Sequence, residues 1–385
     1  MAPTLVASRT ALAPEGANFS RGGPSKNCPT FAKRLLPIAI TMGDPAGIGP
    51  EIIAKAFRDS PHTTRGCFVV GDVATMRRAV QFIGGGPIAL PVALIEAPCD
   101  ALPIPPRCVP VLQIGERVKP VPVGQIDGFS GEMAALCVVW AALAALRGDV
   151  AAIVTAPLHK EALARARAPH CNYPGHTEML QAQAAAFLGK SISEVPVRMM
   201  LANDEIRVVL VSIHMSLREA IGAATFDNVL QTLRITHATL APILGRSPHI
   251  GVAGLNPHAG EGGLFGQEEM DVISPAISAA RAEGIDASGP FAPDTIFMRA
   301  RAKHGKLGEF DVVVAMYHDQ GLIPVKYLGV EKGVNVTLGL PLVRTSPDHG
   351  TAFDIAGTGR ADASSLVEAI RMARSLSSPA PSKAA

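Results

Sequence analysis

The chain has 385 residues and a formal net charge of +2, with 48% hydrophobic and 18% charged residues. This composition excludes a chain that is disordered overall, and the length is sufficient for two domains and a sizeable core. Basic residues are dispersed and aromatic residues make up only 4%, so nucleic-acid binding is not expected. The longest apolar run, 133–146, is about fourteen residues, which is shorter than a membrane-spanning helix requires. We therefore expect neither a nucleic-acid partner nor a membrane.

The chain contains six cysteines, and no two of them form a C-x-x-C pair. Several lie in apolar segments that are typical of strands or helices. Buried, reduced thiols in a cytoplasmic protein are the simplest interpretation, and a cysteine metal site is not expected. The residues concerned are Cys28, Cys67, Cys99, Cys108, Cys137 and Cys171.

Both ends of the chain differ from the rest. Residues 1–35 are rich in Ser, Thr, Pro and Gly and contain Glu15 as their single acid. We expect a disordered leader or a start codon placed too early; the acid-poor composition is also typical of a transit-like targeting segment. Residues 376–385 are expected to be a flexible tail.

The order of elements from residue 36 onward predicts an α/β protein. Apolar strands are expected at 36–41, 67–70 and 150–155. Helices are expected to begin at Pro50, at Ser130 as N-cap of the apolar run 133–146, and at Pro157. This alternation predicts a parallel sheet covered by helices. Residues 87–108 are too rich in proline to assign, and no internal repeat is evident.

The turn after the first predicted strand contains Gly47 and Gly49. The third glycine of a dinucleotide-binding fingerprint is replaced by Ile52. We therefore do not interpret this turn as a Rossmann phosphate loop. A tight turn close to a ligand remains compatible with the glycines.

Three segments share one pattern, an apolar strand followed by a histidine. They are 206–214, 250–258 and 311–318, and they end in His214, His258 and His318. If the strands are parallel, their carboxyl ends lie at one edge of the sheet, where ligands bind in α/β proteins. Three neutral imidazoles there would form a metal site with a position open for substrate. The alternative for each histidine alone is a local hydrogen bond.

A second group of residues suits the recognition of an anion. Residues 173–178, Y-P-G-H-T-E, form a turn that leads into a helix and places His176 and Thr177 near its N-terminus. Downstream, Lys326 offers a point charge and Arg344 a planar fork for phosphate or carboxylate, and Asn335 lies between them. Each residue alone would be interpreted as an ordinary surface side chain.

Two acids lie close to this group in the sequence. Asp294 is either the N-cap of a following helix or a general base. Asp319 either supports His318 or acts as a base.

Six segments resemble the 4-hydroxythreonine-4-phosphate dehydrogenase family, and together they extend from about Leu36 to about Ala373. They are T-M-G-D-P-A-G-I-G-P-E-I (41–52), G-H-T-E (175–178), N-P-H-A-G-E-G-G (256–263), Y-H-D-Q-G (317–321), G-V-N-V-T-L-G-L-P (333–341) and R-T-S-P-D-H-G-T-A-F-D-I-A-G (344–357).

The resemblance implies a fold similar to isocitrate and isopropylmalate dehydrogenases, with two α/β/α domains around a central cleft. The first domain would comprise 36–155 with about 320–375, and the second about 156–319. The resemblance also implies a homodimer with the active site at the subunit interface. The implied metal ligands are His214, His258 and His318, and the implied substrate contacts are His176, Thr177, Lys326, Asn335 and Arg344.

The implied reaction is the oxidation of 4-phosphooxy-L-threonine by NAD or NADP, followed by loss of CO₂. The product would be 3-amino-2-oxopropyl phosphate, a precursor of pyridoxine 5′-phosphate. One divalent ion per site (Zn, Mg or Co) would activate the substrate hydroxyl. Asp294, Asp319 and Lys326 are the candidates for proton transfer.

Two alternatives remain open. One is a related dehydrogenase that acts on a phosphorylated threonate or erythronate, or on a cyclic diol carboxylate. The complete Lys/Arg set favours a phosphorylated substrate over the diol carboxylate. The other is a metal-dependent binding protein of the same fold.

Overall fold

The computed structural model describes residues 35–84, 90–116, 121–303, 306–329 and 332–378. The predicted leader, most of the predicted tail and Cys28 lie outside these residues. From Leu36 onward the chain forms one compact unit. The predicted division of this unit into two domains stays a prediction.

Among the described residues, twelve strands form one mixed sheet in the order β3-β4-β2-β1-β5-β12-β11-β6-β7-β10-β8-β9. Their bounds are β1 Ile38–Thr41, β2 Cys67–Gly71, β3 Val92–Ile95, β4 Val109–Gln113, β5 Ala152–Thr155, β6 Arg198–Ala202, β7 Arg207–Leu210, β8 Ile250–Ala253, β9 Ala287–Phe291, β10 Val312–Ala315, β11 Val334–Leu338 and β12 Arg344–Pro347.

The predicted α/β class is confirmed, but the sheet is not parallel throughout. The strands from β3 to β12 in this order are parallel, as are β7, β10, β8 and β9. Between these groups, β11 and β6 pair antiparallel with each other and with their outer neighbours. The two parallel groups therefore run in opposite directions. The short β11–β12 connection, which needs no crossover helix, is typical of such an antiparallel pair.

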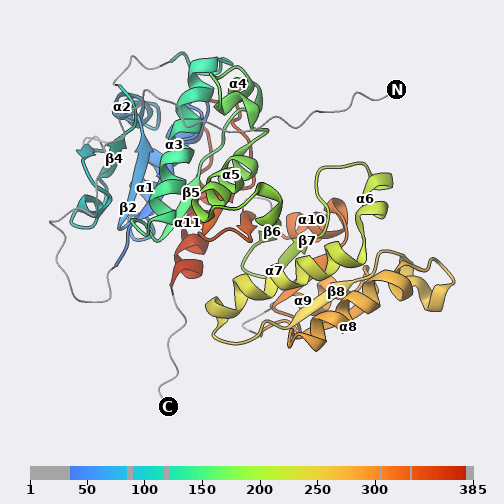
Figure 1. The fold of residues 1–385 in the computed structure, drawn as a ribbon. Coiled ribbons are helices and arrows are strands. Elements are labelled where there is room, and N and C mark those ends of the chain that lie inside the picture. Colours follow the sequence, from blue (N-terminus) through green and yellow to red (C-terminus); the bar gives the residue numbers. More distant parts are fainter. Residues whose placement is uncertain (1–34, 85–89, 117–120, 304–305, 330–331, 379–385) are drawn as a thin grey trace, which may run out of the picture. The chain divides into compact units, whose positions relative to one another are not determined.

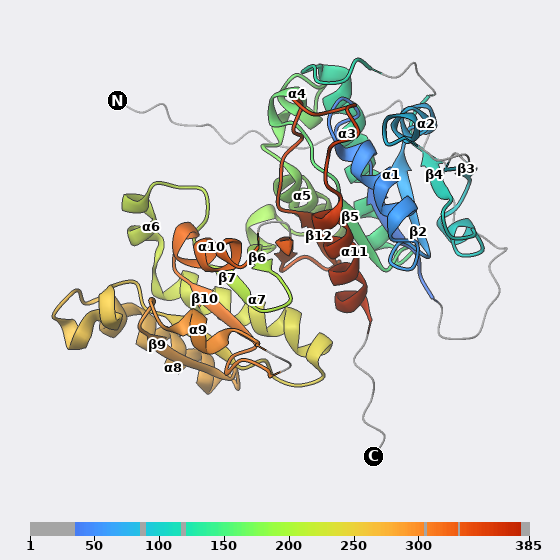
Figure 2. The ribbon, with the colours of Figure 1, turned by 180° about the vertical axis from the view of Figure 1, so that it is seen from behind.

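Helices cover both faces of the sheet (Figures 1 and 2). Over the first parallel group, α3 and α5 lie on one face and α1 and α11 on the other; over the second, α7 and α8 lie opposite α9 and α10. The bounds are α1 Gly49–Asp59, α2 Val73–Phe82, α3 Gly128–Leu146, α4 Lys160–Ala164, α5 His176–Leu188, α6 Leu217–Ala223, α7 Phe226–Leu244, α8 Ser274–Ala282, α9 Ile296–Ala300, α10 His318–Tyr327 and α11 Ser364–Ser377.

Two predicted helix starts are wrong. Helix α3 begins at Gly128 rather than after Ser130, because the Asp127 carboxylate caps it by accepting from the Ser130 amide at 3.2 Å. Helix α4 begins at Lys160 rather than Pro157, with the His159 ring as its cap. In both cases the polar side chain nearest to the first turn determines where the helix starts.

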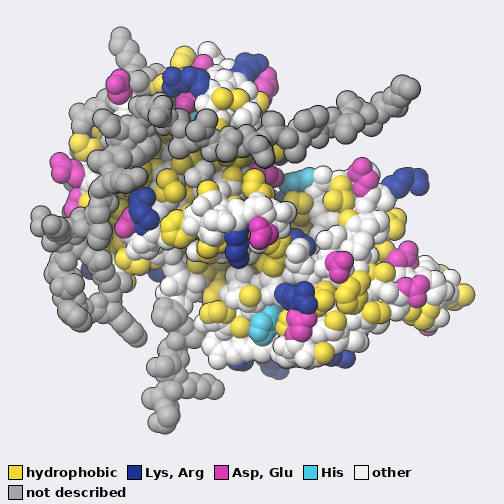
Figure 3. Space-filling model, viewed as in Figure 1, with side chains coloured by type: hydrophobic (Ala, Val, Ile, Leu, Met, Phe, Trp, Pro, Cys, Tyr) yellow, Lys and Arg dark blue, Asp and Glu magenta, His cyan; other side chains and the backbone are white. Residues whose placement is uncertain are grey.

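At 19 residues, α3 is longer than predicted and apolar enough by length and composition to cross a membrane. However, 61% of its apolar window is buried in the protein, where it packs on β1, β2 and β5 and on α4 and α5. It is therefore a core helix of this fold. On the face drawn in Figure 3, charged side chains are scattered rather than gathered in a basic patch.

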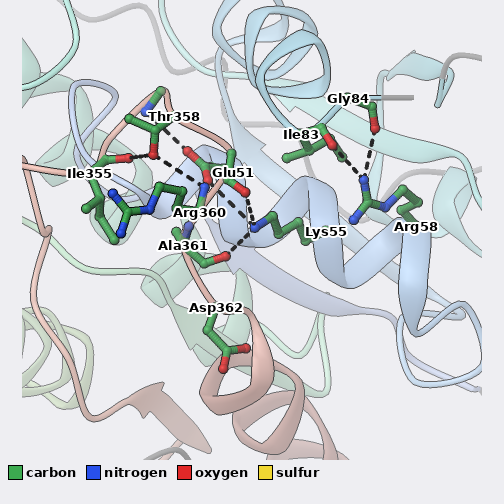
Figure 4. A network of polar contacts seen from close by, with 12 residues as sticks. Glu51, Lys55, Arg58, Ile83, Gly84, Ile355, Thr358, Arg360, Ala361 and Asp362 are labelled. Atoms are coloured by element: carbon green, nitrogen blue, oxygen red, sulfur yellow. Dashed lines mark hydrogen bonds and ion pairs between the residues drawn. The ribbon is translucent and has the colours of Figure 1, made fainter. Parts of the chain in front are cut away.

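The loop after β12 is held by α1 (Figure 4). Glu51 is buried and accepts from the amides of Gly357 and Ala361 at 3.1 and 3.0 Å. Lys55 donates to the carbonyls of Gly359 and Ala361 at 2.7 and 2.5 Å. Glu51 thus accepts from two backbone amides of the loop, and Lys55 donates to two of its backbone carbonyls. These bonds fix the path of a loop that has no regular secondary structure.

Candidate active site

Arg344 is a buried cation at the centre of the sheet. It begins β12, is 5% exposed, and lies opposite Thr337 of β11. Its Nε and Nη2 atoms donate to Thr155 Oγ1 at 3.1 and 2.8 Å, and Nη1 donates to Thr337 Oγ1 at 3.1 Å. Burial lowers the pKa of the guanidinium to about 10. Among the described residues Arg344 has no ion-pair partner; hydroxyl groups orient its charge, and the charge of Glu178 partly opposes the effect of burial on the pKa of Arg344.

His176 lies close to this cation. It is the first residue of α5, a 13-residue helix whose N-cap, Gly175, provides no side-chain cap. Its Nε2 atom is buried without a hydrogen-bond partner in the described structure. Burial, and then the charge of Arg344, hold the pKa of His176 well below its ordinary value. A neutral imidazole, a buried guanidinium and a helix N-terminus together suit a bound anion.

The other predicted anion-binding residues have different surroundings. Thr177 follows His176 in the first turn of α5. Asn335 lies two residues before Thr337 on β11, on the same face of the sheet as Arg344 because strand residues alternate. Lys326 lies in the last turn of α10, where Nζ is 2.7 Å from the Asp348 carboxylate. Lys326 is therefore already paired within the chain, whereas Arg344 is not.

The three histidines follow strands that are parallel and adjacent in the sheet, which meets the condition set by the sequence for a shared site. In the sheet β10 lies between β7 and β8 and is parallel to both. The strands are shorter than expected, so each histidine lies beyond the strand end. His318 is the first residue of α10, His214 precedes α6, and His258 lies in a 3-10 turn.

Two of these histidines are close together. The rings of His214 and His318 have centroids 5.8 Å apart. His318 Nδ1 is 2.7 Å from Asp319 Oδ1, which leaves Nε2 available for a ligand. Burial, then the charge of Lys160 and then His318, lower the pKa of His214. His258 instead lies beside Phe265, with ring centroids 6.2 Å apart. No group of three His, Cys, Asp or Glu side chains poised for a metal occurs in the described part of this single chain.

The structure also shows where the two candidate acids lie. Asp319 contacts His318, which agrees with the supporting role. Asp294 is not the helix cap, since Thr295 occupies the N-cap of α9. Asp294, Asp319 and His258 line one groove of about 660 Å³ between α9 and α10, whose remaining lining is mostly apolar.

The turn between β1 and α1 is filled by the protein's own atoms. A side chain at Gly47 would come within 3.0 Å of Thr351, and the Ile48 amide donates to the Thr351 carbonyl. The Ile48 amide is therefore occupied within the protein, and the interpretation of this turn as something other than a Rossmann loop stays a prediction.

Sequence reasoning missed several residues that shape the site. Thr155 and Thr337 orient Arg344, and strand threonines carry no motif that would reveal this. Gln320 accepts from the Met316 amide at 2.7 Å and donates to the Gly254 carbonyl at 2.7 Å, which ties the end of β10 to the end of β8. The position of Gln320 in the Y-H-D-Q-G segment, two residues after His318, could have indicated in the sequence that it supports the site.

The fold and the site define an α/β protein with a buried arginine in the sheet and three histidines beyond the carboxyl ends of neighbouring strands. The family model for "Pyridoxal phosphate biosynthetic protein PdxA" matches residues 63–373. A protein of Beijerinckia indica subsp. indica named 4-hydroxythreonine-4-phosphate dehydrogenase is 52% identical over 346 residues, covering 90% of this chain and 96% of the relative.

A Salmonella typhimurium protein named D-threonate 4-phosphate dehydrogenase is 44% identical over 339 residues, covering 88% of this chain and 98% of the relative. The crystal structure of a 4-hydroxythreonine-4-phosphate dehydrogenase from Klebsiella pneumoniae superposes with a TM-score of 0.77 at 39% identity, covering 89% of this chain and 100% of the other. The chain belongs to the PdxA family of pyridoxal phosphate biosynthetic proteins.

Proposed function

We propose that this protein oxidises 4-phosphooxy-L-threonine with NAD or NADP and then releases CO₂, giving 3-amino-2-oxopropyl phosphate for pyridoxine 5′-phosphate synthesis. The observation that carries the proposal is the buried Arg344, which has no ion-pair partner among the described residues, beside the unpartnered Nε2 of His176. A buried cation that lacks an anionic partner is costly unless a ligand supplies the charge. Relatives named for a phosphorylated hydroxy acid support such a ligand.

The predicted site residues would bind different groups of the substrate. Arg344 would bind an anionic oxygen of the substrate through its fork, with His176 and Thr177 at the start of α5 and Asn335 on β11 as hydrogen-bonding partners. Lys326 would supply a positive charge from the end of α10, where it is ion-paired with Asp348. Asp319 would orient His318, and Asp294 remains the free carboxylate of the groove that also contains His258.

His214, His258 and His318 would hold one divalent ion. Their chemistry fits, because imidazole donors suit Zn²⁺ or Co²⁺ better than Mg²⁺. A carboxylate on the second ring nitrogen, as at His318, is the usual environment of a ligating histidine. When bound, such an ion lowers the pKa of a hydroxyl that it touches and polarises a carbonyl.

In the proposed reaction, the C3 hydroxyl loses its proton and C3 transfers a hydride to the nicotinamide, giving a ketone. The bond to the carboxylate then breaks, CO₂ leaves, and the carbon takes up a proton. We infer that the protein acts in the cytoplasm, a reducing compartment that suits the buried thiols of Cys67, Cys108 and Cys137.

We propose further that the active protein is a homodimer whose metal site draws on both subunits. His214 and His318 are neighbours within one chain, while His258 lies apart from that pair. Mixing two inactive variants, H214A and H258A, would then restore about a quarter of the activity, since mixed dimers carry one intact site. No recovery after mixing under conditions that exchange subunits would contradict the shared site.

The main experiment supplies purified protein with 4-phosphooxy-L-threonine and either NAD⁺ or NADP⁺, and follows reduced nicotinamide and CO₂. We expect turnover that stops with a chelator and returns with Zn²⁺ or Co²⁺. A parallel assay uses D-threonate 4-phosphate, the second candidate substrate, which is favoured by relatives with that name. Turnover with the threonate alone would overturn the first assignment.

A further inference from the structure

His258 lies in a turn of unusual backbone conformation. Six consecutive residues have positive φ angles, which are 54° at His258, 54° at Ala259, 80° at Gly260, 45° at Glu261, 67° at Gly262 and 96° at Gly263. Three of these residues are not glycine, and the left-handed region is unfavourable for residues with a Cβ atom. Such a run persists only where its surroundings enforce it.

The carboxylate of Glu269, which is 2% exposed, packs against this turn. Its Oε1 atom accepts from the amides of Leu255 and Asn256, both at 2.7 Å, just before the turn. Its Oε2 atom accepts from Asn256 Nδ2 at 2.9 Å. Three donors thus converge on one buried carboxylate, and Glu269 has no ion-pair partner among the described residues.

The turn is built closely around this carboxylate. A Cβ atom on Gly260 would lie 2.7 Å from Glu269 Oε2, so only glycine permits the approach. Glu269 itself begins a π-helical segment, Glu269–Ile273, a local irregularity that often occurs at functional sites. The neighbouring Glu268 accepts from the side chain of Asn256 at 2.7 Å and from the backbone amides of Gln267 and of Glu268 itself, which lie after the turn.

We propose that Glu269 is a positioning residue for the metal centre: its carboxylate fixes the left-handed turn that presents His258, and thereby sets the affinity for a divalent ion. This inference rests on the proposed role of His258 as a ligand. Glu269 acts through hydrogen bonds to the chain before His258 and does not itself touch the ion.

The test is the substitution E269Q in the full-length, chelator-treated protein, titrated with Co²⁺ in the absence of substrate. A carboxylate only accepts hydrogen bonds, whereas the Gln amide also donates, so its nitrogen cannot accept from the donors that the replaced carboxylate oxygen now serves. We expect Co²⁺ to bind about ten- to a hundredfold more weakly. The matched control, E268Q, removes the same charge one residue away and leaves both backbone bonds, so its affinity should stay near that of wild type.

A second variant separates positioning from general stability. Adding A259G to E269Q makes one left-handed position favourable for the backbone and should recover roughly three- to tenfold of the Co²⁺ affinity. A purely structural role for Glu269 would lower the unfolding temperature without changing Co²⁺ affinity well below that temperature.

The Co²⁺ affinity of H258A is measured in the same way, to distinguish a wrong role for Glu269 from a wrong ligand assignment for His258. If H258A loses Co²⁺ binding but E269Q keeps wild-type affinity, Glu269 does not position the ligand and this inference is overturned, while the proposed metal site stands. If H258A binds Co²⁺ as tightly as wild type, the ligand assignment and this inference are both overturned. Loss of affinity in E269Q with recovery in the A259G double variant would support the inference.

Discussion

The two halves of the candidate site are built differently. The proposed anion-binding part, around Arg344, lies inside the sheet, where Thr155 and Thr337 accept three hydrogen bonds from the guanidinium and orient it. The histidine part lies beyond the strand ends, with exposed rings and one histidine on a strained turn. The first is preorganised by the core of a single chain. The second depends on supporting side chains and, in our proposal, on a metal ion and a partner subunit.

This contrast predicts that substitutions around Arg344 and substitutions at the histidines will have different effects on the stability of the fold and on ligand binding. Preorganised charge in the core costs stability and contributes to binding. The histidine edge contributes little to the core, so its loss should affect ligand binding with small effects on folding. The following substitutions test this distinction, from the largest expected effect to the smallest.

The largest effect is expected from R344M. Removing the guanidinium should lower kcat/KM by a factor of about 10²–10³, because a buried charge contact is lost. The unfolding temperature should stay the same or rise, because a buried charge that lacks an ion-pair partner among the described residues is removed. Steady-state kinetics and thermal unfolding measure the two effects.

Arg198 provides the matched control for R344M. It is a partly buried arginine of β6 that also bonds to neutral partners, Thr232 and Gln231, at 2.7 and 2.8 Å. R198M should change the unfolding temperature and leave KM unchanged. Equal kinetic effects of R198M and R344M would contradict the proposal that Arg344 binds an anionic group of the substrate.

The second prediction concerns Asp44, a fully buried acid in the turn after β1. Burial raises its pKa from 3.8 to about 6, against an opposing hydrogen bond from the Ala46 amide. Because the folded-state pKa lies above the unfolded one, this group favours folding fully below pH 3.8 and loses that contribution as the pH rises through 6. The contribution amounts to about 3 kcal/mol.

Denaturant unfolding of wild type and D44N between pH 3.5 and about 8 checks the Asp44 prediction. The difference in unfolding free energy should move in favour of D44N as the pH rises. A pH-independent difference would mean that folding does not raise the pKa of Asp44.

The third prediction tests how Arg344 is oriented. T155V removes the hydroxyl that accepts from two of its nitrogen atoms and should cost about 1–3 kcal/mol in transition-state binding, measured as kcat/KM. T155S retains the oxygen and should behave like wild type. A similar loss in T155S would point to packing of the threonine methyl group rather than to the hydrogen bonds.

The smallest effect is expected from Q320M, which removes the bridge between the ends of β10 and β8. Two hydrogen bonds are lost, so the unfolding free energy should fall by about 1–2 kcal/mol. Because β10 and β8 lead to His318 and His258, Co²⁺ affinity should also fall several-fold. Unchanged affinity with lowered stability would show that the bridge serves the sheet alone.

Several features followed from local sequence. The apolar runs at 67–70 and 150–155 predicted strands, and the strands occur there, because a run of buried β-branched residues has few other stable environments. The histidines after three such runs would lie at one edge of the sheet if their strands were parallel, and β7, β10 and β8 are parallel neighbours. A polar residue that follows an apolar strand can therefore be recognised from the sequence alone.

Other features were decided only by the tertiary structure. The antiparallel pairing of β11 with β6 and β12 depends on contacts between distant segments, so the sequence suggested a parallel sheet instead. The burial of Arg344 and its contact with Thr155 join residues far apart in the chain. The helix starts at Gly128 and Lys160 were set by single caps, and the role proposed for Glu269 depends on its packing against a turn whose sequence motif ends before Glu269. The sequence by itself thus determined which residues are available for chemistry. The long-range packing determined which of them are buried, charged and held in place, because burial and hydrogen bonding depend on neighbours that are remote in the chain.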